Sequence, residues 1–410
     1  MTSMEDESQK ALVSAVRLSD YTPQEEVDRA LEQVLQPLGG MAAFVKPGQK
    51  VLLKPNLVAP SAPDLAVTTH PALVRAVIRQ VKAAGGLCFL GDGPGVGGTL
   101  TAAKASGLLE VAEAEGAQFV VFEETAVFEN NDNRILKHIE LTKHLKEMDV
   151  LITLPKLKTH CQMAYTGALK NQYGLIPGAA KGKFHFRFQN RDRLADFMID
   201  INRTAAPSLA IMDAVVGMEG PGPSGGTPRK IGLLLASSDL SALDTIAFSI
   251  IGLTLPQVPV SLAAKRGNFG TVELERIELS GPPLDELRIK DFDLVRAPLN
   301  IMRILPLPRF MLRWIRRQVA PAPRINPKIC IKCRRCERGC PVSPPAIQPV
   351  AEGGPKVDDG SCIRCYCCHE FCPVKAIELK KSLLARCINF DALSRIGSRL
   401  VGSIAAFFRR

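Results

Sequence analysis

Apolar residues occur in short unbroken runs through the first 295 residues, and amphipathic segments separate these runs. The runs that predict strands lie at 50–54, 87–92, 118–122, 149–155, 208–216 and 230–237. Segments 71–86 and 99–116 instead carry apolar residues at helical spacing, and Thr22 with Glu25 predicts a capping box before an earlier helix. Strands that are apolar throughout suit a sheet covered on both faces. The alternation predicts an α/β fold with a mostly parallel, doubly wound sheet.

A different pattern begins at residue 296 and divides the chain into four predicted segments. These are the α/β domain (1–295), a basic, proline-rich connector with an amphipathic helix near 310–319 (296–325), a small α+β cysteine module (326–380) and a C-terminal amphipathic helix (381–410). Both helices carry arginine beside an apolar stripe, which suits docking onto the protein or peripheral contact with an anionic membrane. The narrow stripes favour docking.

The cysteines of residues 326–380 form an internal repeat. Two runs share the spacing Cys-x2-Cys-x2-Cys-x3-Cys-Pro and match at a constant offset of 32 residues. This spacing is typical of two-cluster bacterial ferredoxins, in which the fourth cysteine of each run binds the other cluster. It predicts a ferredoxin-like fold with two [4Fe-4S] clusters. The predicted ligands are Cys330, Cys333, Cys336 and Cys372 for cluster 1, and Cys362, Cys365, Cys368 and Cys340 for cluster 2.

Cys367 lies outside this repeat, because its counterpart in the first run is Arg335. We therefore interpret Cys367 as a thiol that binds no iron. The alternative for the whole module is zinc, held in two four-cysteine sites. A doubled run with the same spacings and a following proline favours iron–sulfur clusters.

The net charge is concentrated in one part of the chain. The formal charge is +11, and residues 296–340 carry twelve Lys or Arg and one Glu, so the rest of the chain sums to zero. A local basic segment suits anionic clusters better than a nucleic-acid surface. The opening residues MTSMEDESQK lack the basic and apolar parts of a signal peptide. We therefore expect cytoplasmic localisation and cysteines that bind metal rather than form disulfides.

Polar side chains follow several of the predicted strands. In open α/β sheets, ligands bind beyond the carboxyl ends of the strands. If the loops converge there, their lysines, amides and acids form a cleft for an anionic small molecule; the alternative is that these are solvated loop charges. The candidate site residues are Lys54, Asn56, Asp92, Lys156, Lys158, His160, Lys170, Asn171, Asp213 and Glu219.

Two further segments have more than one interpretation. The loop GDGPGVGG, with Gly93, Gly95 and Gly98, matches a dinucleotide fingerprint after a strand and before a helix, but Pro94 stiffens it and favours a structural turn. His185 lies in the basic, aromatic stretch KGKFHFRF, which suits substrate binding or a mobile cover over the cleft, but a surface loop with half-buried phenylalanines is favoured.

Four blocks of the first segment resemble a known family. They are VLLKPNLV at 51–58, LPKLKTH at 154–160, TGALKNQYGLIPG at 166–178 and MDAVVGMEGPGPSGG at 212–226. Together they are similar to domain of unknown function family 362, whose members often carry a C-terminal ferredoxin module. The resemblance covers about half of the chain and the module. It implies an architecture and an iron–sulfur protein, and it implies no particular reaction.

Three hypotheses for the function follow. The first is an electron-transfer protein, in which two clusters relay electrons between a redox partner protein and a ligand or partner of the α/β domain. Such a protein could itself be an oxidoreductase. The second is a non-catalytic, ferredoxin-like adaptor that docks a redox partner. The third is an enzyme whose clusters are purely structural.

Overall fold

The structure is a computed structural model, and it describes residues 10–95, 97–178, 180–295, 311, 320–349 and 354–380. The chain divides into two compact units, Met1–Val295 and Arg296–Arg410. The amphipathic helices predicted near 310–319 and within 381–410 lie outside the described residues, apart from Met311.

The first unit is built on a ten-stranded sheet in the part of the chain that the structure describes. Its strands, in order across the sheet, are β12 (Ile277–Ser280), β1 (Ala11–Arg17), β11 (Thr227–Ser237), β10 (Leu209–Glu219), β7 (Val150–Leu154), β2 (Lys50–Pro55), β3 (Leu87–Leu90) and β4 (Gln118–Phe119). Strand β8 (Lys156–His160) continues beyond β7 along β10, and β9 (Ala164–Thr166) pairs with β8.

Most pairings in this sheet are parallel. The order β10-β7-β2-β3-β4 is parallel throughout, as is the pair β1 and β12. Strand β11 is antiparallel to both of its neighbours, and β9 is antiparallel to β8. The sheet is therefore mixed but mostly parallel, and the predicted α/β fold is confirmed.

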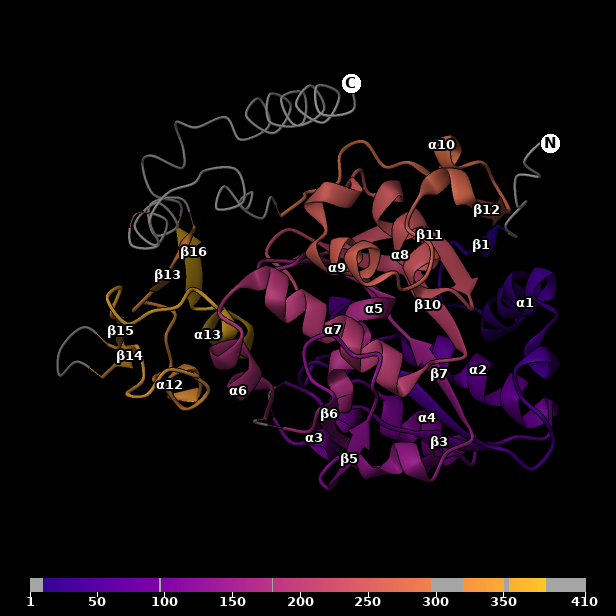
Figure 1. The fold of residues 1–410 in the computed structure, drawn as a ribbon, viewed down its shortest axis with the longest axis horizontal. Coiled ribbons are helices and arrows are strands. Elements are labelled where there is room, and N and C mark those ends of the chain that lie inside the picture. Colours follow the sequence, from indigo (N-terminus) through magenta and orange to yellow (C-terminus); the bar gives the residue numbers. More distant parts are fainter. Residues whose placement is uncertain are drawn as a thin grey trace. The chain divides into compact units, whose positions relative to one another are not determined.

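Helices cover both faces of the sheet (Figure 1). Alternate strand residues belong to separate cores: Val51 and Leu53 of β2 face one, and Leu52 faces the other. The first core contains residues of α1 (Gln24–Leu35), α2 (Pro71–Ala83), α3 (Thr99–Ala105) and α4 (Leu108–Ala114). The second contains residues of α5 (Ala168–Asn171), α7 (Arg191–Ala205), α8 (Leu240–Ile250) and α9 (Pro259–Gly267). Two buried faces explain why the strands are apolar throughout.

Some predicted local features are wrong. The helix expected over 99–116 is two helices, α3 and α4, because Gly107 takes a left-handed conformation (φ 72°) between them. Helix α1 begins at Gln24 with Pro23 as its N-cap and no side-chain capping bond, so the capping box is also wrong. Strand β1 and the hairpin of β5 (Thr125–Glu129) with β6 (His138–Thr142) were not predicted.

The described part of the second unit is a small α+β module with two similar halves. Strand β13 (Ala322–Ile325) pairs with β16 (Ile377–Lys380), and β14 (Ile347–Gln348) pairs with β15 (Lys356–Val357), both antiparallel. Helices α12 (Arg335–Arg338) and α13 (Cys367–Phe371) start 32 residues apart. Within the described ranges of both units, no helix is long and apolar enough to cross a membrane.

Candidate functional site

Each set of predicted cluster ligands lines one cavity of the module. Cys330, Cys333, Cys336 and Cys372 line the first, whose apolar wall includes Ile325, Ile347 and Ile377. Cys340, Cys362, Cys365 and Cys368 line the second, beside Ile347 and Val357. In each cavity, three cysteines come from one run and the fourth from the other run. Apolar side chains that exclude water around a ring of thiols are the kind of surroundings in which iron–sulfur clusters are held.

The two cysteine loops have the same unusual backbone. Lys332 and Arg334 adopt left-handed conformations (φ 56° and 59°), as do their counterparts Arg364 and Tyr366 (φ 56° and 64°). Non-glycine residues rarely adopt this conformation, so its recurrence at matched positions indicates that both loops must curl. A curled loop points its closely spaced cysteines toward one centre.

Main-chain amides also contact the fourth cysteine of each run. The N–H group of Ala346 donates to Sγ of Cys340 at 3.4 Å, and that of Ala376 donates to Sγ of Cys372 at 3.1 Å. Hydrogen bonds to sulfur stabilise thiolates and tune cluster potentials. Cys367 is buried next to these ligands but lines neither cavity.

The donor set is compatible with a four-iron cluster in each cavity. In the described ranges, no group of three or more His, Cys, Asp or Glu side chains is placed to hold one metal ion. Zinc needs four ligands about 2.3 Å from a single centre. The four cysteines of a cubane each bind a different iron and therefore surround a volume. Eight thiols arranged around two cavities suit the geometry of two cubane clusters.

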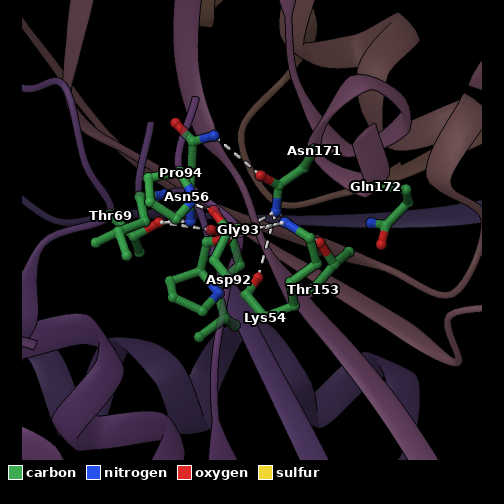
Figure 2. A network of polar contacts seen from close by, with 12 residues as sticks. Lys54, Asn56, Thr69, Asp92, Gly93, Pro94, Thr153, Asn171 and Gln172 are labelled. Carbon is green, nitrogen blue, oxygen red and sulfur yellow. Dashed lines mark hydrogen bonds and ion pairs between the residues drawn. The ribbon is translucent and has the colours of Figure 1, made fainter. Parts of the chain in front are cut away.

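In the α/β unit, several of the other candidate residues meet at the carboxyl edge of the parallel strands (Figure 2). Lys54, near the end of β2, is fully buried, and its Nζ lies 2.7 Å from Oδ1 of Asp92, just beyond β3. The other carboxylate oxygen of Asp92 accepts from the N–H of Leu57 at 2.8 Å. Burial lowers the pKa of Lys54, and the Asp92 carboxylate opposes that shift. A Cβ at Gly174 would lie 2.0 Å from Oδ1 of Asp92, so this pair requires glycine there.

An amide network joins this pair to the next strand. Nδ2 of Asn171 donates to Oγ1 of Thr153 at 2.8 Å and, over longer distances, to the carbonyl oxygens of Lys54 and Pro55. Oδ1 of Asn171 accepts from Asn56 at 3.0 Å, and Asn56 in turn accepts from the Nζ of Lys158. Lys158 is fully buried. These contacts bring β2, β7 and β8 together at one edge, where the sequence predicted that the loops would converge.

A second buried ion pair lies on the neighbouring strands. Nζ of Lys156 lies 2.9 Å from Oδ2 of Asp213 and donates to the Tyr21 hydroxyl at 2.8 Å. That hydroxyl donates to Oδ1 of Asp213 at 2.6 Å, and the ring of Tyr21 stacks on His70 with centroids 3.5 Å apart. Burial lowers the pKa of Lys156, opposed by Asp213. Neither Tyr21 nor His70 was predicted as a site residue, and no local motif marks either one.

Lys181 of α6 (Ala180–Arg187) adds a further cation near the first pair. Its Nζ donates to the carbonyl oxygens of Gly93 and, at 3.3 Å, Pro94. The pKa of Lys181 is lowered to about 8, mainly by burial; the Asp92 carboxylate opposes the shift, and the charges of Lys54 and Lys170 add to it. The basic sequence KGKFHFRF was the available signal for Lys181.

His185 lies on the same helix, four residues along. Its ring meets Tyr173 edge-on, with centroids 5.8 Å apart. Its Nδ1 is buried and has no hydrogen-bond partner among the residues that the structure describes. Burial and, to a smaller extent, the charge of Lys170 lower the pKa of His185 to about 4, so the ring is neutral at pH 7. The stretch expected as a surface loop is therefore a helix with one half-buried face.

The candidates His160 and Glu219 and the glycine loop make contacts of other kinds. His160 is buried, and its Nδ1 accepts from the main chain of Gln162 at 3.1 Å. Glu219 accepts from the N–H of Asp293 at 3.0 Å and lies 3.9 Å from Arg229, and no contact described here joins it to the lysines. In the glycine loop, the N–H groups of Gly93 and Gly95 donate to Gly174 and Val58. These two amides are already used within the protein, which favours the interpretation of the loop as a structural turn.

Known proteins are similar to a large part of the chain. The model of DUF362, a domain of unknown function, matches residues 51–249. The thylakoid-associated protein sll1697 of Synechocystis sp. (strain ATCC 27184 / PCC 6803 / Kazusa) is 37% identical over 238 residues, which cover 58% of this chain and 74% of that protein.

Two solved structures are more distant. The lactate racemase apoprotein of Thermoanaerobacterium thermosaccharolyticum is 19% identical with a TM-score of 0.36, and the match covers 59% of this chain and 58% of that one. A protein from Thermotoga maritima is 12% identical with a TM-score of 0.34, covering 62% of this chain and 60% of that one. The chain thus spans less than two thirds of either structure. The family match and the cyanobacterial relative together show that the chain belongs to the DUF362 family.

Proposed function

We propose that this protein is a cytoplasmic iron–sulfur electron-transfer protein with two [4Fe-4S] clusters. The observation that carries the proposal is the pair of cavities, each lined by three cysteines of one run and the fourth cysteine of the other. Such clusters supply one-electron chemistry when bound. The chain contributes the thiolates, the amides of Ala346 and Ala376 that contact sulfur, and apolar walls that limit water. Two clusters in one small module suit a relay between a redox partner and the α/β domain.

Iron and sulfide counting on anaerobically purified protein tests the cofactor. About eight irons per chain are expected for two cubanes. Cys368→Ala should lose iron because Cys368 lines the second cavity, whereas Cys367→Ala, its matched control, should keep it. Iron loss from Cys367→Ala together with full iron in Cys368→Ala would show that the ligand register is wrong. Two zinc ions and no iron would contradict the proposal.

Electron paramagnetic resonance during reduction separates a relay from structural clusters. A relay requires clusters that accept electrons from a physiological one-electron donor and return them. Structural clusters would stay unreduced by such donors, and their removal would unfold the module. The adaptor hypothesis predicts reversible reduction without any turnover of a bound small molecule.

We also propose that the carboxyl edge of the sheet binds an anionic small molecule. The supporting observation is the position of two lysines beside the Asp92 loop: Nζ of Lys54 pairs with Asp92, and Nζ of Lys181 donates to the carbonyl oxygens of Gly93 and Pro94. An anion would offset that positive charge. Inorganic phosphate and small carboxylates should raise the melting temperature of the wild type more than that of Lys170→Ala. Lys104→Ala, an exposed control on α3, should behave like wild type. Equal shifts in all three proteins would exclude this site.

A further inference from the structure

The duplicated module allows its two cysteine loops to be compared position by position. Residues 326–340 and 358–372 are matched segments with the same cysteine spacing and the same left-handed positions. The first segment carries five Lys or Arg and one Glu, whereas the second carries one Arg and three acids. The backbone repeats, but the charge does not.

The cations of the first loop are exposed. The exposed cations are Lys328, Lys332, Arg334, Arg335 and Arg338. Three of them, Lys332, Arg334 and Arg335, line the cavity of cluster 1. Between them lie two exposed apolar side chains, Ile329 and Ile331, with 45% and 60% of their surface accessible. Ile331 lines the same cavity, so the surface of the module is only one residue from cluster 1.

The second loop has the opposite character. Its one arginine, Arg364, is buried and paired with Asp359 at 3.2 Å. Tyr366 and Cys367, the counterparts of the exposed Arg334 and Arg335, are buried. If the cations served only to offset cluster charge, both loops would need them, because both predicted clusters have the same thiolate ligands. Charge compensation therefore does not explain the difference.

We propose that the loop of residues 328–338 is a docking surface for an acidic one-electron carrier protein, which exchanges electrons with cluster 1. This inference rests on the proposed function. Exposed cations around an apolar centre suit a partner with a negative patch around its own redox group, since such charges steer encounter and the apolar contact excludes water. Transient electron-transfer complexes commonly use small interfaces.

Two small oxidants of opposite charge test the local field at cluster 1. In stopped flow, dithionite-reduced protein gives one electron to ferricyanide, which becomes ferrocyanide, or one electron to hexaamminecobalt(III), which becomes cobalt(II). We expect the ferricyanide rate to fall and the hexaamminecobalt rate to rise with added salt. The double variant Lys328→Glu/Lys332→Glu should lower the first rate and raise the second, each by about tenfold at low salt. Lys332→Glu alone changes the charge by the same amount as the control Lys380→Glu, which lies on β16 and lines neither cavity, and only Lys332→Glu should change the two rates in opposite directions.

Opposite responses to the two oxidants distinguish docking from a change in potential. A shifted potential would change both rates in the same direction, and that result would overturn the docking surface. Vesicles of anionic lipid provide a second test. If wild type binds them and the double variant does not, while both oxidant rates are the same in the two proteins, the loop is a membrane contact and the proposed docking surface is wrong. A wild-type protein that holds no iron would contradict the proposed function itself.

Discussion

Replacing Lys156 with methionine tests whether the buried pair with Asp213 is closed off from water. Methionine keeps much of the volume of the side chain and removes its charge. The Asp213 carboxylate then stays buried, with the Tyr21 hydroxyl and the N–H of His70 as its remaining close donors. Both charged side chains are at most 1% exposed, so solvent cannot replace the lost ammonium group.

The expected cost is large for a single substitution. Removing one partner of a buried pair costs about 3–5 kcal/mol, because an uncompensated charge remains in the interior. Arg79→Met is the matched control, since Arg79 lies 2.9 Å from Asp28 and is about half exposed. Exposed pairs contribute about 0–1 kcal/mol. The Lys156 variant should therefore melt roughly 10 °C lower than wild type, and the control within about 4 °C of it.

Urea unfolding followed by far-ultraviolet circular dichroism measures the free energy of unfolding of wild type and of each variant. The double variant Lys156→Met/Asp213→Asn should recover part of the loss, because it removes both charges together. Equal losses for Lys156→Met and Arg79→Met would refute the reasoning, since they would mean that water or a neutral lysine already relieves the pair.

Other predictions concern the same unit and the tail. Gly174→Ala should separate Lys54 from Asp92 and lower the free energy of unfolding by about 1–3 kcal/mol in the same urea assay. Gly182→Ala is the control and should be neutral or stabilising, because nothing lies within 4 Å of its added Cβ. Burial lowers the pKa of His70 to about 4. Between about pH 6.5 and 4 the imidazole therefore binds a proton in the unfolded chain but not in the folded protein. The free energy of unfolding should decrease as the pH is lowered through this range. His70→Asn, which can still cap α2, should flatten that slope; an unchanged slope would assign it to other groups. Deleting residues 393–410 should leave sedimentation with anionic vesicles unchanged, and release from them would favour the membrane alternative.

The sequence was most informative where the signal is local. The cysteine spacing and the offset of 32 predicted which thiols belong together, and each predicted set lines one cavity. The unbroken apolar strands predicted the doubly wound sheet for a similar reason, since a strand that is apolar at nearly every position indicates a sheet buried on both faces. The break at Gly107 also had a local signal, but helical periodicity on both sides of the glycine hid it.

The polar edge was less predictable because its partners are distant along the chain. Lys156 and Asp213 lie 57 residues apart, and Tyr21 lies 135 residues from Lys156. A strand-end lysine looks the same in a sequence whether it is solvated or buried, and only the fold decides. The predicted convergence of loops is seen in the structure, but Lys54, Lys156 and Lys158 are buried and bonded to the protein itself. Lys170, half-buried, and Lys181 of the helix α6 are the cations nearer to solvent.

The position of the buried charges indicates what they are for. A buried ion pair stabilises a fold weakly, because the cost of desolvating both charges offsets most of their attraction, and packed apolar side chains would serve as well. Two such pairs, Lys54–Asp92 and Lys156–Asp213, nevertheless lie together at the carboxyl edge of the sheet, the place where open α/β sheets bind ligands. The strand positions just before Lys54, Val51 to Leu53, are apolar. Stability alone gives no reason for that distribution, so charges kept at this edge favour a role in holding or orienting a ligand.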